Sequence, residues 1–195
     1  MDGFEKRKEQ KKESIRRAAI ELFQNHGFKK VSISDIAKRA DVSQVTIYNH
    51  FGSKEELVRD VLQWYAMMLL ARYKSIMESD RPFLDKLEEI VFDKSEVISQ
   101  FQGELMQTWM QNDPEMQEFI NNLYASHVMP IARNFFNEGL QQGNIDRKFS
   151  LEAIMVYFEI LRQGFFNTPE LSERAQSNPG LMKELIRLMT YGLNG

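Results

Sequence analysis

The fold is decided by one stretch of sequence, SISDIAKRADVSQVTIYNHF, which spans residues 32–51. Its Ser32 stands three residues before Asp35, the spacing of a capping box that starts a helix. Apolar side chains then recur on one side of the predicted helix, and this pattern stops at Asp41-Val42-Ser43. Because Ser43 is a favourable N-cap, a further short helix should begin directly after it. Two short helices joined by a three-residue turn predict a helix-turn-helix.

The second of these helices carries an unusual outer surface. At about 100° per residue, Ile47 and Phe51 share one face, which we expect to be buried. The remaining surface has no Lys or Glu, and it presents Val45, Thr46, Tyr48 and Asn49. Amide side chains can pair with adenine and methyl groups can contact thymine, so this surface fits the major groove of DNA. Hydroxyl and ring N–H groups suit phosphates.

Two residues of this helix leave alternatives open. Tyr48 either faces the DNA or packs as a core aromatic with its hydroxyl at the rim. His50 either contacts a phosphate or is a plain surface residue.

The flanking residues extend the pattern on both sides. An apolar stripe from Ile15 to Phe23 predicts an amphipathic helix that ends at Gly27, which adopts a left-handed backbone without steric cost. Downstream, Ser53 and Glu56 form a second capping box that opens a long helix. The positive end of that helix, with Lys54 in its first turn, is a predicted phosphate site.

The N-terminal segment closely resembles the DNA-binding domain of TetR-family regulators over about residues 8–62. The matching run is Gly27-Phe28, Val31-Ser32-Ile33-Ser34-Asp35-Ile36-Ala37, Ala40-Asp41-Val42-Ser43, Thr46-Ile47-Tyr48-Asn49-His50-Phe51 and Ser53-Lys54-Glu55-Glu56-Leu57. The resemblance implies phosphate contacts by Thr46, Tyr48 and Lys54, and base contacts by Gln44, Val45 and Asn49. The predicted DNA-binding set is Ser32, Ser43, Gln44, Val45, Thr46, Tyr48, Asn49, His50 and Lys54.

Two positions depart from the family's pattern. Residue 45 is most often Gly or another small residue in the family, and here it is Val, which alters the surface facing the bases. Residue 31 is commonly Thr, and here it is Val, so one phosphate contact is lost and Ser32 is left to supply the hydroxyl.

The whole chain is predicted to be all-α, with about nine helices. We expect a DNA-binding domain at residues 1–53 and a ligand-binding and dimerisation domain at residues 54–195. Helix breaks are expected at Asp80-Arg81-Pro82, weakly near Lys94-Ser95, and at Asp113-Pro114. Within the long helical segment 114–142, Pro130 should cause a kink because it lacks a backbone donor.

The C-terminal helices indicate a homodimer. The helix predicted over residues 151–165 is apolar on more than one face, so one face should pack on its own core and another on a partner. The last helix adds Leu181, Leu185, Leu188 and Met189. The TetR resemblance likewise implies a dimer formed by the last two long helices. Two copies of the helix-turn-helix could then reach half-sites of a palindromic operator, about 34–36 Å or more apart.

A small apolar or amphipathic effector is the expected ligand of the C-terminal domain, because aromatic and Met side chains line adaptable pockets. The candidate ligand-binding residues are Trp64, Met68, Glu104, Trp109, Phe119, Tyr124, Phe158, Glu159 and Gln163. Any single aromatic among them is more often a core residue. Glu159 has the further alternative of a surface pair with Arg162. The expected function is a ligand-responsive regulator, and family members most often act as repressors.

Composition excludes several other functions. The chain has no Cys and three scattered His, so disulfides, thiolate chemistry and a structural metal are not expected. No paired carboxylates, nucleophile elbow or glycine-rich phosphate loop occur, so we expect neither an enzyme nor a cofactor. No apolar run is long enough for a membrane span, and a cytoplasmic location is expected. A helical-bundle interaction protein that has lost operator binding is the alternative function.

Charge is distributed unevenly along the chain. Residues 1–60 carry 13 Lys and Arg against 10 Asp and Glu, whereas residues 61–195 carry 12 against 18. A basic N-terminal segment on an acidic body indicates a polyanionic partner at one end only, in agreement with double-stranded DNA.

Overall fold

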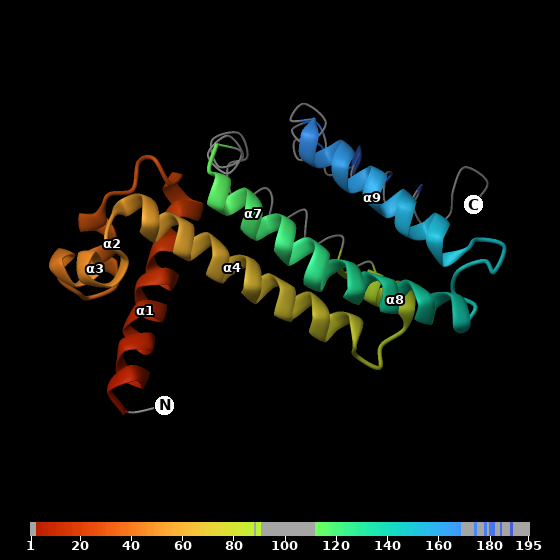
Figure 1. The fold of residues 1–195 in the computed structure, drawn as a ribbon, viewed down its shortest axis with the longest axis horizontal. Helices are drawn as coiled ribbons and strands as arrows, with labels where there is room; N and C mark the ends of the chain where they lie inside the picture. The colour runs from red at the N-terminus through yellow and green to blue at the C-terminus, as the bar shows by residue number, and fades with distance from the viewer. Residues whose placement is uncertain are drawn as a thin grey trace. The chain divides into compact units, whose positions relative to one another are not determined.

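A computed structural model describes residues 3–87, 89–90 and 112–168, with single positions beyond residue 168. Every element in this part of the chain is helical, which confirms the all-α prediction. In chain order the elements are α1 (Gly3–His26), α2 (Ile33–Arg39), α3 (Gln44–Phe51), α4 (Lys54–Met77), α7 (Pro114–Leu123), the π-helical turn η1 (Tyr124–Val128), α8 (Met129–Gln141) and α9 (Leu151–Asn167) (Figure 1).

The helix count differs slightly from the prediction. Seven α-helices and one π-helical turn have defined bounds in the described part of the chain, where residues 83–87 and 89–90 are helical as well, against about nine helices predicted for the whole chain. The break predicted near Lys94-Ser95 lies outside the described residues. So does the last helix, apart from single positions.

The described residues divide into two compact units. One comprises residues 3–69 with residues 112–119, and the other comprises residues 70–90 with residues 120–168. The helices α4 and α7 therefore each contribute residues to both units. The domain boundary predicted between residues 53 and 54 remains a prediction.

The turn between α2 and α3 is closed by local hydrogen bonds. The Ser32 hydroxyl accepts from the Asp35 N–H at 3.1 Å, and the Asp35 carboxylate accepts from the Ser32 N–H at 2.8 Å, so the predicted capping box is confirmed. At the other end of α2, Asp41 has a φ of 54°, which turns the chain sharply. The Val42 N–H then donates to the Ala37 carbonyl at 3.0 Å, a bond of the Schellman type.

The core of the first unit lies between α1, α2, α3 and the start of α4. Gly27 ends α1 with a φ of 76°, and its N–H donates to the Phe23 carbonyl at 2.8 Å, as predicted for this glycine. The largest fully buried apolar side chains in this unit are Ile15, Phe23, Ile36, Ile47, Leu57, Val61 and, on α7, Met116. Each contributes about 1.5–3 kcal/mol by leaving water, so burial holds the short helices α2 and α3 in place.

Local capping also fixes the start of α4. The Glu56 N–H donates to the Ser53 hydroxyl, and the Ser53 N–H donates to the Glu56 carboxylate, both at 3.0 Å. This confirms the second predicted capping box. The helix runs on to Met77, just before the predicted break at residues 80–82.

A π-helical turn precedes Pro130, while the predicted kink stays a prediction. Between α7 and α8 the chain stays helical, but Tyr124–Val128 widens to a π-helix. Proline lacks an N–H, and its ring collides with the carbonyl four residues earlier, so an ordinary α-helical turn is disfavoured there. A widened turn relieves both constraints without ending the helix.

A buried lysine links the end of α4 to α8 in the second unit. Lys86 is 1% exposed, and its Nζ donates to the carbonyl oxygens of Met77 at 3.0 Å and Ser79 at 3.2 Å. It also pairs with Glu138 of α8 at 3.2 Å, and it lies over the Phe135 ring. A cation at the carbonyl end of α4 complements the helix dipole, so Lys86 fastens this end of α4 to α8.

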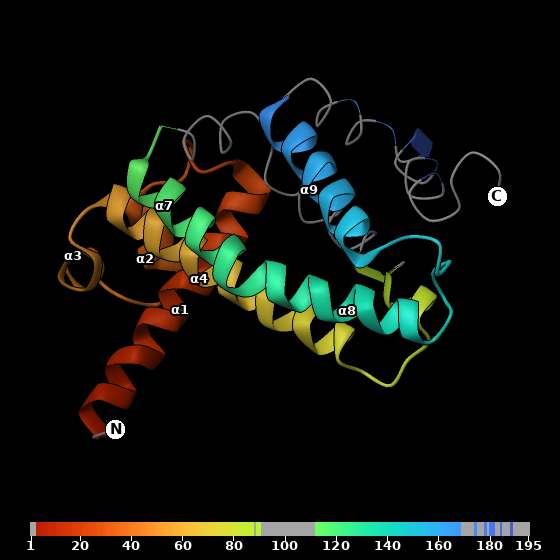
Figure 2. The ribbon, with the colours of Figure 1, turned by 45° about the vertical axis from the view of Figure 1, so that its right-hand side comes forward.

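Aromatic contacts complete this unit. Phe83 stacks on Phe135 of α8 with ring centroids 4.6 Å apart. Phe136 of α8 meets Phe158 of α9 edge to face at 5.9 Å, and α9 packs against α8 (Figure 2). Ser150 caps α9 by accepting from the Ala153 N–H.

Candidate nucleic-acid interface

The recognition surface predicted on α3 is exposed. Ile47 is fully buried and Phe51 is 8% exposed, so this face of α3 anchors the helix in the core as expected. On the other side Val45 is 66% exposed and Tyr48 is 48% exposed. Gln44 and Asn49 are exposed as well, and Thr46 is half-buried. Tyr48 is thus not a buried core aromatic.

The hydroxyl groups at the start of α3 are held in a pair. The Thr46 N–H donates to the Ser43 hydroxyl at 3.0 Å, which confirms Ser43 as the N-cap. The hydroxyl oxygens of the two residues are 2.8 Å apart and share a hydrogen bond. This bond orients both groups at the end of α3 where the backbone N–H groups favour an anion.

Ser32 is differently placed. Its hydroxyl donates to the Asp35 carboxylate at 2.6 Å, and this bond is the main reason why the pKa of Asp35 is lowered. The Ser32 hydroxyl therefore already donates its proton to a carboxylate and cannot donate it to a phosphate at the same time. The predicted phosphate contact of Ser32 needs that bond to open.

His50 lies at the end of α3, half-buried against the Phe51 ring. Burial lowers its pKa, and the nearby Lys12, Lys8 and Lys11 lower it further. The imidazole is therefore neutral at pH 7. Within the part of the chain that the structure describes, its buried Nδ1 atom has no hydrogen-bond partner.

Lys54 is the first residue of α4 and is half-buried. It lies one residue after the Ser53 cap, so its ammonium and the free N–H groups of the first turn are close in sequence. This placement is compatible with the predicted phosphate site.

Ion pairs that the sequence did not predict hold the helices around α3 in place. Arg16 of α1 is 9% exposed and donates to the Asp60 carboxylate of α4 at 2.5 and 3.1 Å. This bond is the main cause that raises the pKa of Arg16, and Glu9 adds a second pair at 2.6 Å. The sequence feature that could have indicated this ion pair is the arginine directly after Ile15, at the edge of the apolar stripe of α1.

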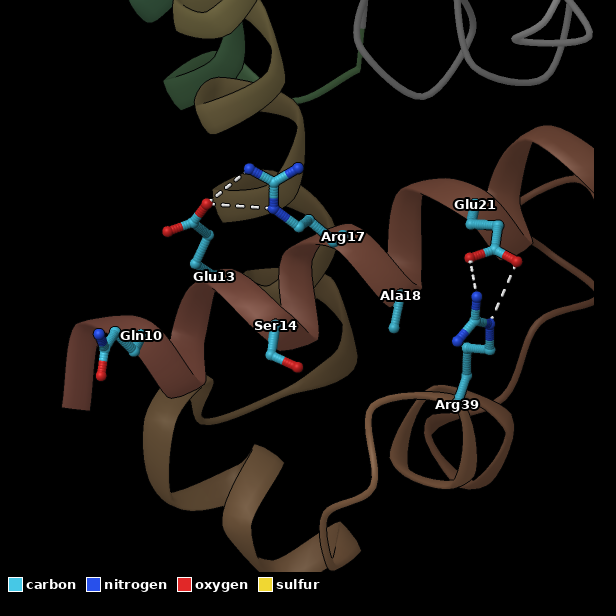
Figure 3. A pocket seen from close by; sticks show the side chains of 7 residues that line it. All are labelled: Gln10, Glu13, Ser14, Arg17, Ala18, Glu21 and Arg39. Atoms are coloured by element: carbon cyan, nitrogen blue, oxygen red, sulfur yellow. Dashed lines mark hydrogen bonds and ion pairs between the residues drawn. The ribbon is translucent and has the colours of Figure 1, made fainter. Parts of the chain in front are cut away.

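A second ion pair joins α1 to α2. Arg39 of α2 makes two hydrogen bonds to Glu21 of α1, at 2.6 and 3.1 Å (Figure 3). Beside it lies a shallow surface hollow of about 350 Å³. The residues that line the hollow are Gln10, Glu13, Ser14, Arg17, Ala18, Glu21 and Arg39. Arg17 also pairs with Glu13 there, so the ionic groups that line the hollow neutralise one another.

The start of α7 belongs to the same unit. Arg59 of α4 donates to Asp113 at 3.0 Å and also pairs with Glu115 at 3.0 Å. Burial acts to raise the pKa of Asp113, but hydrogen bonds from the Met116 N–H and from Arg59 lower it overall. Adjacent residues of α4, Arg59 and Asp60, thus hold α7 and α1.

The predicted ligand-binding residues are brought together only in part. Tyr124 of η1 donates to Glu159 of α9, and Gln163 donates to the same carboxylate at 2.7 Å. Phe158 lies in the aromatic contacts of α8 and α9. The Arg162 side chain lies outside the described residues, so the alternative pair with Glu159 stays open.

The other candidates stand apart from this cluster. Trp64 lies within the first unit, and Cζ of the Arg17 guanidinium is 5.7 Å from the centroid of the Trp64 ring. Met68 is 40% exposed on α4, and Phe119 is half-buried on α7. Glu104 and Trp109 lie outside the described residues.

Two other kinds of site were also sought in the described residues. They contain no cluster of three His, Asp or Glu side chains that could hold a metal ion. None of the described helices combines the length and the apolar composition that crossing a bilayer requires.

Known proteins share this arrangement. The family described as "Bacterial regulatory proteins, tetR family" matches residues 15–61, the segment from the stripe of α1 to the start of α4. This segment of the chain matches the TetR family. Its sequence is 30% identical to the HTH-type transcriptional repressor KstR2 of Mycobacterium tuberculosis over 88 residues, which cover 45% of this chain and 44% of KstR2. The match thus spans less than half the length of that relative.

Longer matches extend the similarity to known regulators beyond the helix-turn-helix. The HTH-type transcriptional regulator UidR of Escherichia coli is 28% identical over 148 residues, which cover 74% of each chain. The structure of the transcriptional regulator FadR from Bacillus subtilis, solved in complex with stearoyl-CoA, superimposes with a TM-score of 0.63 at 19% identity. That superposition covers 93% of this chain and 98% of FadR, and it establishes a common fold.

Proposed function

We propose that this TetR-family chain is a transcriptional regulator that binds a palindromic DNA operator as a homodimer. The observation that carries the proposal is the outward face of α3, where Val45 and Tyr48 are strongly exposed beside Asn49. Exposed apolar and amide side chains without charge are costly on a solvated helix but suit base edges in a major groove. The curated relatives named above are DNA-binding regulators, which favours this function over an enzyme.

The paired hydroxyls and the helix ends supply the contacts that set the register. Ser43 and Thr46 lie at the start of α3, and Lys54 begins α4. These groups suit phosphates on either side of the groove, with base contacts left to Gln44, Val45 and Asn49. Neutral His50 is the weakest member of the predicted set, because it has no charge to offer a phosphate at pH 7.

The dimer would form through α9 and the last helix. In a single chain Val156 is 54% exposed, Tyr157 is 47% exposed and Ile160 is 62% exposed, and these positions share one face of α9. On the opposite side Met155 is only 4% exposed. The helix thus has one face on its own unit and an apolar face that a second copy can cover, as the sequence pattern suggested.

The second unit would bind a small apolar or amphipathic ligand. Tyr124, Glu159 and Gln163 form a polar cluster next to the aromatic contacts of α8 and α9, and such a combination can orient an amphipathic molecule. That FadR was solved with stearoyl-CoA supports testing ligands of this kind.

Ligand binding would alter DNA affinity through the helices common to both units. Because α4 and α7 each contribute residues to both units, a ligand that moves either helix would change the spacing of the two recognition helices. This requires the ligand to bind the spread state more tightly than the DNA-bound state.

The decisive experiment is binding of the purified protein to DNA from its own promoter region, scanned against salt concentration. We expect two-fold-symmetric protection that weakens steeply with salt and is lost in Tyr48→Ala. Phe149→Ala, which removes another exposed aromatic side chain in the second unit, should bind as the wild type does. Weak binding to all sequences alike, unaffected by Tyr48→Ala, would contradict the proposed function.

A further inference from the structure

Three lysines of α1 continue the face that builds the core. Ile15 and Ala19 are fully buried on this face. One and two turns before Ile15, the same face carries Lys8, Lys11 and Lys12. Lys8 and Lys11 are exposed and Lys12 is half-buried. The helix thus runs past the edge of the apolar core, and the face that was apolar becomes basic.

These lysines lie beside the end of the recognition helix. The Nζ of Lys12 is 5.3 Å from the centroid of the Phe51 ring, the last residue of α3. The charges of all three lysines act on His50, the residue before Phe51, and help to lower its pKa. Glu9 acts in the opposite direction, because its negative charge raises the pKa of His50.

The neighbouring carboxylates of α1 are already neutralised. Glu9 pairs with Arg16 at 2.6 Å, and Glu13 pairs with Arg17 at 2.6 Å. Among the described residues 3–87, 89–90 and 112–168, no ion pair joins Lys8, Lys11 or Lys12 to a carboxylate. Like charges three and four residues apart repel one another on a helix, so this cluster does not stabilise the free protein. Its positive potential is available to a polyanion.

We propose that Lys8, Lys11 and Lys12 form a second DNA contact, which binds backbone phosphates next to the groove occupied by α3. The proposal rests on the proposed function and extends it to residues outside the helix-turn-helix. Lysine ammonium groups bind phosphates as point charges and read no bases, so this contact adds affinity without sequence preference. Its position beside α3 makes it continuous with the recognition surface.

The experiment compares two charge-matched double variants of the full-length protein. Lys8→Gln with Lys11→Gln removes two exposed charges of the cluster and leaves the Lys12 contact with Phe51 in place. Lys74→Gln with Lys148→Gln removes two exposed charges in the second unit. Binding to promoter DNA and to an unrelated duplex of equal length is measured by fluorescence anisotropy over a range of salt concentrations. Circular dichroism melting checks that both variants fold.

The cluster variant should reduce the slope of log affinity against log salt by about 1.8, because each lost phosphate contact removes about 0.9. Its affinity at physiological salt should fall roughly ten-fold or more for both duplexes alike, and the control should stay within about two-fold of wild type. An unchanged slope, or equal losses in both double variants, would overturn the proposal while leaving the recognition role of α3 intact. Failure of the wild type to bind any DNA would instead overturn the proposed function, and this proposal with it.

Discussion

The turn of the helix-turn-helix depends on one residue, Asp41, which holds a φ of 54° although it is not glycine. In this region of backbone space a Cβ atom lies close to the following carbonyl, and Asp and Asn tolerate the crowding better than other residues do. The conformation lets the Val42 N–H reach the Ala37 carbonyl, which ends α2 and directs the chain into α3.

Replacement of Asp41 by Val should therefore destabilise the protein. We expect Asp41→Val to lower the free energy of unfolding by about 1–2 kcal/mol, because a β-branched side chain strongly disfavours positive φ. Asp41→Gly should be close to neutral, since glycine accepts this conformation but gains entropy in the unfolded chain. Urea unfolding followed by circular dichroism measures both. Ser34→Val, at an exposed helical position of α2, is the control, and an Asp41→Val protein as stable as that control would refute the role of the turn.

At the scale of the helix, the packing of α8 depends on Gly139. This residue is buried, and a Cβ atom built on it would lie 2.7 Å from Cε2 of Phe83 and 3.0 Å from Cδ1 of Ile145. The distance to Phe83 is too short for two carbon atoms and the distance to Ile145 is tight, so a side chain at residue 139 would force Phe83 to move. Phe83 in turn stacks on Phe135, which means that the small residue supports the aromatic contacts of the unit.

Gly139→Ala should destabilise the protein, although alanine is the better helix former. The overpacking against Phe83 costs about 1–3 kcal/mol, which exceeds the gain in helix propensity of about 1 kcal/mol. A double-mutant cycle with Phe83→Leu, measured by thermal unfolding, tests the cause. The two substitutions together should cost less than the sum of their separate effects; strict additivity would show that the clash with Phe83 is not the reason.

For the whole molecule, the exposed face of α9 is the surface through which the proposed dimer would form. Val156, Tyr157 and Ile160 present apolar surface that a single chain leaves in water. Covering it with a second copy removes that cost and also places two recognition helices on one assembly. Reading a palindromic operator requires both helices, so association and specific DNA binding should be lost together.

Ile160→Glu should convert the proposed dimer to a monomer. Ile160 is 62% exposed in the single chain, so the substitution leaves the folded monomer intact but places a carboxylate in the covered face. Burying an unpaired charge costs several kcal/mol, which raises the dimer dissociation constant about 100-fold or more. Sedimentation velocity over a range of protein concentrations measures this.

The matched control is Leu84→Glu, at a position outside α9 that is 41% exposed. It should remain dimeric and keep its affinity for the operator. If Ile160→Glu stays dimeric and Leu84→Glu does not, the interface lies elsewhere.

The sequence by itself determined the elements and the exposed face of the recognition helix. The caps at Ser32, Ser43 and Ser53 involve residues three apart, and the burial of Ile47 opposite Val45 follows from helical periodicity. These features depend on neighbours within about one or two turns, so local spacing is sufficient to predict them.

The tertiary structure alone decided which distant residues meet. Arg16 finds Asp60, which is 44 residues away, and Glu138 lies 52 residues from the Lys86 it neutralises. Likewise, the lysines of α1 reach the end of α3 only because the core brings the two helices together. Charges have no periodicity that identifies their partners, and packing of the apolar faces is what selects them.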